Sequence, residues 1–333
     1  MVSRFSFIVL LSLLLYSCTS SSKKFLVTEE TKITVGSGPE DMVIDRSTGE
    51  ARLLISCASR REGESPFGEI VAYYPATRKV DTLTRIGVPE ELNFHPHGIF
   101  LDTTLSPHLL YAISHEKDDK FHPVYVYEVG ADTLIFKELI SSELVYSPNA
   151  LTLGPNGEII IVNDSGKRGS MMEKAIKLNR ANIVWLEKSE DGTWDARIVA
   201  EGLGYPAGIN RIGDNIYAGD AVNHLFHIYT IENGELIPQE PLPGLKGNDN
   251  IRVVDGMIYV AGHVKPLKFI GHAISSANRS PVEVWRVNPD SREITSIYYT
   301  EGQTISAGST AVMLEGKLYI CQVFDPYILE VEF

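Results

Sequence analysis

Short apolar runs separated by tight turns follow one another along most of the chain. The runs are rich in Val, Ile, Tyr and Phe, as in EIVAYYP at 69–75, VYVYEV at 124–129 and EIIIVND at 158–164. Turn sequences such as PNGE, VDGM and LEGK stand between them. Runs of this kind, bounded by Gly, Asn and Asp, predict β-strands, so we expect an all-β protein. The best helix candidate is SMMEKAIKLNRA at 170–181, which interrupts the strand pattern as an insertion.

The strand pattern itself repeats six times. Each repeat begins with a turn of small residues, continues through one or two polar residues and enters an alternating strand. One anchor residue per repeat gives spacings between 42 and 59 residues, at Glu40, His97, Asn149, Ala207, Asp249 and Gly308. Periods of this size, with about four strands in each, are typical of a β-propeller, so the sequence predicts six blades. Two stacked β-sandwiches are the alternative, but they do not explain a sixfold recurrence.

Propeller geometry brings the polar residues of these repeats together. The first strand of each blade lines the central channel, and the loops entering these strands open at one end of it. The residues expected to meet there are Glu40, His97, Asn149, Asp249 and Asn250, with Asn210 slightly deeper along its strand. Carboxylate and amide oxygens suit Ca²⁺ better than zinc or copper, and a buried carboxylate cluster needs a cation to offset repulsion. Singly these are ordinary turn residues, but together they predict a calcium site.

Histidines supply the second part of a catalytic centre. Calcium polarises a carbonyl or phosphoryl oxygen, and a further group must then activate water. His97 begins a channel-lining strand, where a neutral imidazole suits a general base. His115 ends the next strand and is expected to orient His97, while His263 is expected to form a wall of the pocket. His95 is interpreted as a turn residue.

The N-terminal residues have the pattern of an export signal. Arg4 precedes an apolar run from Phe5 to Leu15 that is too short to span a bilayer, and the run ends at LYSC. This segment resembles the lipobox of bacterial lipoproteins, in which the cysteine, here Cys18, is lipidated. We expect 1–17 to be a lipoprotein-type signal peptide, 18–32 a lipidated tether and 33–333 the propeller. An ordinary secretory signal is the alternative, and either one places the protein outside the cytoplasm, anchored to the membrane or secreted.

Charge and cysteine content narrow the function further. The chain has a net charge of −13 and lacks basic clusters, which makes it a poor binder of nucleic acid. Cys57 and Cys321 lie inside apolar strand patterns and are expected to be buried free thiols, with a bridge between them as the alternative. The sequence is therefore not that of a disulfide-stapled scaffold.

Several short motifs occur in an order that carries a family resemblance. GPED, HPHGI, YSPNAL, GINRIGDNIY, NDNIRV, AGH and GSTAVMLEGKLYI, spread over 36–330, resemble the serum paraoxonase/arylesterase family and, more distantly, the gluconolactonase and senescence-marker group. The resemblance implies a six-bladed propeller with a catalytic calcium in its channel and a structural calcium beneath it. By position it implies catalytic-calcium ligands at Glu40, Asn149, Asp249 and Asn250, a general base at His97 with His115 as its partner, and part of the structural site at Asp41 and the carbonyl of Ile99.

Two positions depart from the family pattern. Ala207 stands where the family has a further asparagine ligand, a loss that Asn210 or water would have to fill. Ala150 stands where the family has an aspartate of the structural site, so we expect one calcium rather than two. The family's terminal cysteine bridge has no counterpart either, because the chain ends in ILEVEF, and ring closure is expected to rest on strand pairing alone.

These expectations combine into a calcium-dependent hydrolase that acts on small lactones or aryl esters. In this hypothesis His97 takes a proton from the attacking water, and Asn149 or Asn250 helps the calcium to hold the oxyanion. Two alternatives stay open. A sugar lactonase of the gluconolactonase type is favoured if three or four protein ligands suffice for the metal. A non-catalytic binding or scaffold propeller is favoured by Ala207 and Ala150.

Overall fold

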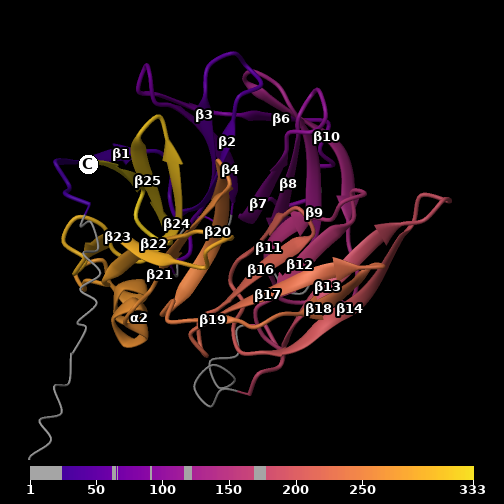
Figure 1. The fold of residues 1–333 in the computed structure, drawn as a ribbon. Coiled ribbons are helices and arrows are strands. Elements are labelled where there is room, and N and C mark those ends of the chain that lie inside the picture. The colour runs from indigo at the N-terminus through magenta and orange to yellow at the C-terminus, as the bar shows by residue number, and fades with distance from the viewer. Residues whose placement is uncertain (1–24, 62–64, 66, 91, 116–121, 169–177) are drawn as a thin grey trace, which may run out of the picture.

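Figure 1 shows the computed structural model, which describes residues 25–61, 65, 67–90, 92–115, 122–168 and 178–333. Cys18 with the predicted signal peptide, and residues 170–177 of the predicted helix, lie outside these described residues. Among the residues that are described, no helix is long and apolar enough to cross a membrane.

The strands form six sheets, which confirms the six-bladed β-propeller and rules out two stacked sandwiches. Blade 1 contains β2 (Pro39–Asp45), β3 (Arg52–Ala58), β4 (Gly68–Tyr74) and β5 (Lys79–Thr82). Blade 2 contains β7 (Pro96–Asp102), β8 (Leu109–Ser114), β9 (Val124–Val129) and β10 (Thr133–Ile140), with β6 (Thr84–Ile86) added at its outer edge. Blade 3 contains β11 (Pro148–Leu153), β12 (Ile159–Asn163), β13 (Ala181–Lys188) and β14 (Trp194–Leu203).

The next two blades repeat this order from the channel outward. Blade 4 contains β15 (Ile209–Ile212), β16 (Asn215–Asp220), β17 (Leu225–Glu232) and β18 (Glu235–Pro238), and β19 (Leu242–Pro243) also pairs with β17. Blade 5 contains β20 (Asn248–Val254), β21 (Met257–Gly262), β22 (Val282–Val287) and β23 (Ile294–Thr300). Each predicted repeat of about four strands therefore corresponds to one blade.

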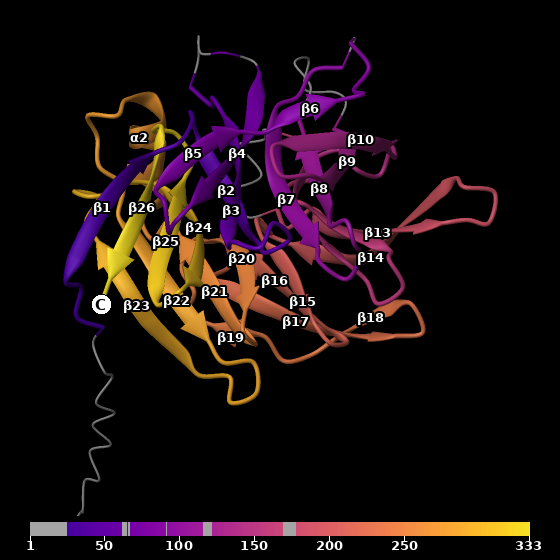
Figure 2. The same ribbon diagram turned by 90° about the horizontal axis from the view of Figure 1, so that it is seen from above.

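The sixth blade closes the ring with both ends of the chain. It contains β24 (Gly308–Leu314), β25 (Lys317–Gln322), β26 (Tyr327–Glu332) and, at its outer edge, β1 (Glu29–Thr34). Figure 2 shows β1 beside β26, with which it pairs antiparallel along its whole length. Closure by strand pairing is as expected. The sequence boundary needs correction, because residues 29–32 belong to β1 and not to a tether.

One helix that the sequence analysis did not predict lies between β21 and β22. This helix, α2 (Pro266–Ile274), has Pro266 at its first turn and no side-chain cap at Lys265. Phe269 packs with Val323 and Phe324, so α2 covers the loop that follows β25 of blade 6. A single short helix without a capping side chain gives little sequence signal.

The innermost strands β2, β7, β11, β15, β20 and β24 contact one another in a ring around the channel. The ring is tight where the site residues begin. A Cβ atom on Gly98 would lie 2.2 Å from the carbonyl oxygen of Asn149, and one on Gly208 would lie 2.4 Å from that of Asp249. Glycine therefore follows His97 and Ala207 because the adjacent inner strand leaves no room for a side chain.

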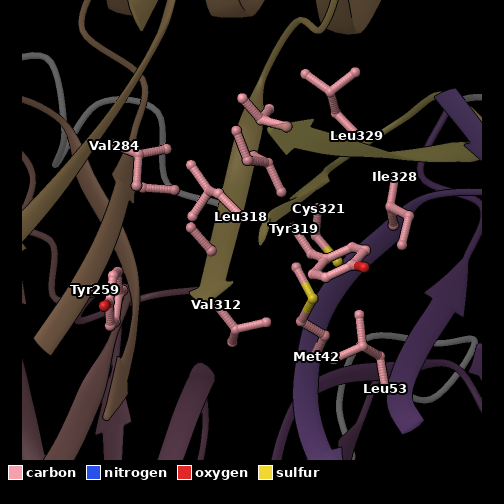
Figure 3. Close-up of a cluster of buried hydrophobic side chains, with 14 of the residues drawn as sticks. Met42, Leu53, Tyr259, Val284, Val312, Leu318, Tyr319, Cys321, Ile328 and Leu329 are labelled. Atoms are coloured by element: carbon pink, nitrogen blue, oxygen red, sulfur yellow. The ribbon is translucent and has the colours of Figure 1, made fainter. Parts of the chain in front are cut away.

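Apolar side chains fill the spaces between the blades. Figure 3 shows the cluster between blades 1, 5 and 6, which includes Met42, Val312, Tyr319 and Cys321. Cys57 belongs to the same cluster, and both thiols are buried and free, as expected. This dry packing holds each inner strand in place and so fixes what lies at the end of the channel.

Candidate functional site

The predicted site residues of four blades lie in β-bulges at the start of the innermost strands. The register shifts occur at Glu40 in β2, at His97 and Gly98 in β7, at Asn149 in β11, and at Asp249 and Asn250 in β20. A bulge leaves its extra residue outside the hydrogen-bonded ladder and re-aims the side chain. The turn-and-polar signature of the repeats is therefore a backbone device that frees these side chains to meet.

Blades 1 and 2 meet in a buried ion-pair cluster. Oε2 of Glu40 lies 3.0 Å from Nδ1 of His97 and 3.1 Å from Nη2 of Arg60. Arg60 is fixed by further donation to three backbone carbonyls, those of Gly38, Ala58 and Pro96. Nη2 of Arg60 also lies 3.2 Å from Nδ1 of His97, so Glu40 and Arg60 together hold the Nδ1 side of the ring.

Glu40 carries an electrostatic strain that a cation would relieve. Burial raises the pKa of this carboxyl to about 8; Arg60 opposes the shift, while the carboxylates of Asp249 and Asp41 raise the pKa further. Three carboxylates from blades 1 and 5 thus act on one another in a buried space. A divalent cation between Glu40 and Asp249 would keep Glu40 ionised at neutral pH.

Amide oxygens complete this oxygen-rich centre. Asn149 and Asn250 are buried, and within the described part of the chain neither Oδ1 has a hydrogen-bond partner. Buried polar atoms are normally satisfied, so these orphaned oxygens indicate a ligand. No three His, Cys, Asp or Glu side chains among the described residues gather closely enough to hold a metal by themselves. The amides are therefore needed beside the carboxylates, and a set of this chemistry fits Ca²⁺.

The two predicted histidines of blade 2 lie together. His97 and His115, which follows β8, have ring centroids 4.7 Å apart, and Nδ1 of His115 lies 3.2 Å from Nδ1 of His122. Burial lowers the pKa of His97 well below 6.5, and the guanidinium groups of Arg60 and Arg168 lower it further. Burial likewise lowers the pKa of His115. Both rings are therefore neutral at physiological pH, while the catalytic roles of the two residues stay predictions.

His263 and His95 occupy different surroundings. Nε2 of His263 lies 2.7 Å from Oδ2 of Asp249, and its ring packs on Phe269 of α2 with centroids 4.1 Å apart. His263 thus lies beside a proposed ligand, on the side of the centre that α2 covers. Nε2 of His95 lies 2.9 Å from the carbonyl oxygen of Ser59, which ties the ring to a loop, as interpreted from the sequence.

Three predicted metal ligands, Asn210, Asp41 and Ile99, have their oxygens bound by other protein groups. Nδ2 of Asn210 donates to the carbonyl of Ile251 over 3.0 Å, and its Oδ1 accepts from the backbone nitrogen of Arg211 over 2.8 Å. Asn210 therefore links neighbouring inner strands, and its amide is not free to supply the ligand missing at Ala207. The carboxylate of Asp41 and the carbonyl of Ile99 both accept a hydrogen bond from Arg252.

Sequence reasoning missed three residues of this region: Arg60, His122 and Arg252. Arg60 follows β3 in the polar stretch SRREGE, which looks like an ordinary solvated loop. Arg252 occupies a strand position, where only the fold reveals its partners. His122 carried a signal that the sequence could have given. It stands just before the predicted strand at 124–129, and His115 ends the preceding strand, so the two histidines flank the same end of a pair of strands.

The propeller thus gathers buried carboxylates, orphaned amide oxygens and a neutral imidazole at one end of its channel. The family model described as Arylesterase matches residues 74–329, and the chain belongs to this family. Human serum paraoxonase/arylesterase 2 is 25% identical over 239 residues, which cover 68% of this chain and 66% of that protein. Serum paraoxonase/arylesterase 1 of Rattus norvegicus is 26% identical over 246 residues, covering 70% and 67%. The match thus spans about two thirds of these relatives' length.

Solved structures agree with the fold. A luciferin-regenerating enzyme superposes with a TM-score of 0.60 at 10% identity, covering 92% of this chain and 95% of its own. A gluconolactonase from Xanthomonas campestris superposes with a TM-score of 0.58 at 12% identity, covering 91% and 89%. At such identities these two likenesses show the fold alone. The family is one of lactonase- and esterase-like hydrolases and is generally calcium-dependent.

Proposed function

We propose that this chain is a calcium-dependent hydrolase of lactones and aryl esters. The observation that carries the proposal is the pair of orphaned amide oxygens of Asn149 and Asn250 beside buried Glu40 and Asp249. Calcium held by these four side chains would polarise the carbonyl oxygen of the substrate. The unfilled ligand position at Ala207 leaves room in the coordination shell for substrate or water.

The His97 ring supports this chemistry through its two nitrogens. In the tautomer with the proton on Nδ1, that nitrogen donates to Oε2 of Glu40, 3.0 Å away. Nε2 then carries the free lone pair, and it has no hydrogen-bond partner among the described residues. Because the pKa of His97 is lowered, the ring is unprotonated at neutral pH. Its Nε2 can then accept a proton from the attacking water. In this proposal the side-chain amide of Asn149 or Asn250 donates to the oxyanion.

Chelation tests the metal directly. Protein stripped with EDTA should lose at least about 100-fold of its hydrolytic rate, because the main electrophile is gone, and added Ca²⁺ should restore it. The assay uses phenyl acetate, an aliphatic lactone and a sugar lactone, with circular dichroism to verify that the stripped protein stays folded. A rate that survives exhaustive chelation would contradict the metal-dependent mechanism.

The same panel separates the competing functions. Hydrolysis confined to the sugar lactone would favour a sugar lactonase, an alternative that the loss of one metal ligand at Ala207 supports. Saturable binding without turnover on every substrate would favour a non-catalytic propeller. Hydrolysis of phenyl acetate and the aliphatic lactone is the result expected here.

The proposed enzyme is anchored outside the cytoplasm by a lipid on Cys18. The support is the position of this cysteine at the end of the apolar run, in LYSC. Cys18→Ala should move the protein from the membrane fraction to the soluble fraction and abolish incorporation of labelled fatty acid. Cys57→Ala, a change at a buried thiol of blade 1, should leave both properties unchanged. Membrane association that persists in Cys18→Ala would contradict the anchor.

A further inference from the structure

A buried guanidinium lies deeper in the channel than the oxygen-rich centre. Arg252 follows Asn250 by two positions along β20, and only 6% of its side chain is exposed. Its Nη2 donates to the carboxylate of Asp41 and, over 2.8 Å, to the carbonyl of Ile99. Its Nε donates to the carbonyl of Met42 over 2.8 Å. One side chain of blade 5 therefore binds the inner strands of blades 1 and 2.

The Asp41 carboxylate extends this network to the sixth blade. It is fully buried, and Oδ1 accepts from the backbone nitrogen of Met42 and from Oγ1 of Thr310, each over 2.9 Å. Oδ2 accepts from the backbone nitrogen of Ile99 over 2.8 Å in addition to Arg252. Both carboxylate oxygens are satisfied, and the negative charge has a guanidinium partner at contact distance.

These are the oxygens that the family resemblance assigns to a second, structural calcium. Both receive Nη2 of Arg252 instead, and a divalent cation on the same buried oxygens would meet strong repulsion from the guanidinium. The residues present therefore do not fit a second calcium. We propose that Arg252 takes the place of that ion, so that the inner strands are held together without a structural metal and the chain binds a single calcium. The prediction that the chain binds one calcium rests on the proposed function, whereas the replacement of the structural ion by Arg252 does not.

Charge balance links this replacement to Ala150. A divalent cation is neutralised by two carboxylates, whereas Arg252 carries one positive charge and is matched by Asp41 alone. Ala150, at the start of β11 and only 2% exposed, stands where the family pattern has a carboxylate. A second carboxylate at this buried position would add a negative charge that Arg252 does not neutralise. We infer that Arg252 and Ala150 are parts of one exchange.

Calcium stoichiometry tests the proposal on the full chain. Metal-stripped protein is titrated with CaCl₂ by isothermal calorimetry, and we expect one equivalent. Two equivalents would overturn the replacement. No binding would instead contradict the proposed function, and the replacement would then be decided by the variants alone.

Variants exchange the guanidinium for the ion. In calcium-free buffer Arg252→Ser should lower Tm by roughly 5–10 °C, because it leaves the buried Asp41 charge without its partner, and Arg252→Lys should recover part of the loss. The double variant Arg252→Ser/Ala150→Asp should gain one calcium equivalent over wild type. It should also acquire a Tm that rises with calcium more than that of wild type does.

Arg211→Ser provides the matched control. Arg211 also links two inner strands, but it donates to the backbone carbonyls of Leu153 and Gly213. Its replacement should cost less Tm and leave the calcium stoichiometry unchanged. The proposal is overturned if Arg252→Ser costs no more than this control, or if the folded double variant binds no additional calcium.

Discussion

Replacing His97 with glutamine should lower kcat for lactones and aryl esters by about 10²–10⁴-fold, the usual contribution of a positioned general base. The change removes the free lone pair of Nε2 but keeps an amide that can donate toward Glu40 Oε2. Calcium affinity should therefore stay close to the wild-type value. Steady-state kinetics at saturating calcium measure the first quantity, and calcium titration measures the second.

His95→Gln is the matched control for this substitution. His95 lies two residues earlier, and its Nε2 lies against the carbonyl of Ser59 and not at the centre. It should change kcat only a few-fold, since it loses one loop contact. If His97→Gln turned over at the wild-type rate, the base would have to be assigned to another residue. If it lost calcium as well as activity, His97 would serve the metal centre and not the proton transfer.

Much of the fold is predictable because each repeat in the sequence corresponds to one blade, and every blade makes the same structural demands. Each innermost strand needs a tight turn, a bulge and an alternating run, and these demands leave the same signature around Glu40, His97, Asn149 and Asp249. Convergence of these residues then follows from propeller topology, which places the start of each innermost strand at one end of the channel. The same reasoning finds His115, because it lies one hairpin away from His97.

The sequence fails where a residue's role depends on its partner in another blade. Asn210 has the residue type of a ligand, but its amide bonds the backbone of β20. Asp41 likewise has the carboxylate of a ligand, but the long side chain of Arg252 reaches it across 211 positions of sequence. Such contacts have no local pattern, since any arginine in a strand looks alike until its neighbours are known. The short helix α2 could not be predicted for another reason: it is held by the tertiary packing of Phe269 and not by local helix propensity.

Arg52→Met should reduce the free energy of unfolding by about 3–5 kcal/mol, the cost of breaking a buried ion pair on one side. Arg52 in β3 is fully buried, and its Nε donates to Oδ2 of Asp45 over 2.8 Å. Its Nη2 donates to the carbonyl of Gly130 over 2.6 Å, and its Nη1 donates to that of Ala131. The guanidinium thus ties blade 1 to the turn between β9 and β10 of blade 2. Methionine fills a similar volume but leaves the Asp45 carboxylate without its cation.

The pH dependence of this loss identifies its cause. Burial by itself would raise the pKa of Asp45, but hydrogen bonds from Ser47 and Arg52 outweigh it, and the pKa lies below 3.8. The pair therefore stabilises the protein above the unfolded-state pKa, and its contribution is lost as pH falls through the lower, folded-state pKa. Urea unfolding of Arg52→Met and wild type should differ fully at neutral pH and converge below pH ~4.

Two companion variants separate the buried charge from general packing damage. Adding Asp45→Asn to Arg52→Met should restore part of the lost stability, because no unpaired charge then remains in the interior. Arg78→Met removes an ion pair in which the arginine side chain is 54% exposed, and the partner, Glu330, keeps its contacts with Lys317 and Tyr319, so the change should cost no more than about 1 kcal/mol. An Arg52→Met variant no less stable than Arg78→Met would show that the Asp45 pair is not what holds blades 1 and 2 together. The contact between blades would then rest on the apolar side chains between them alone.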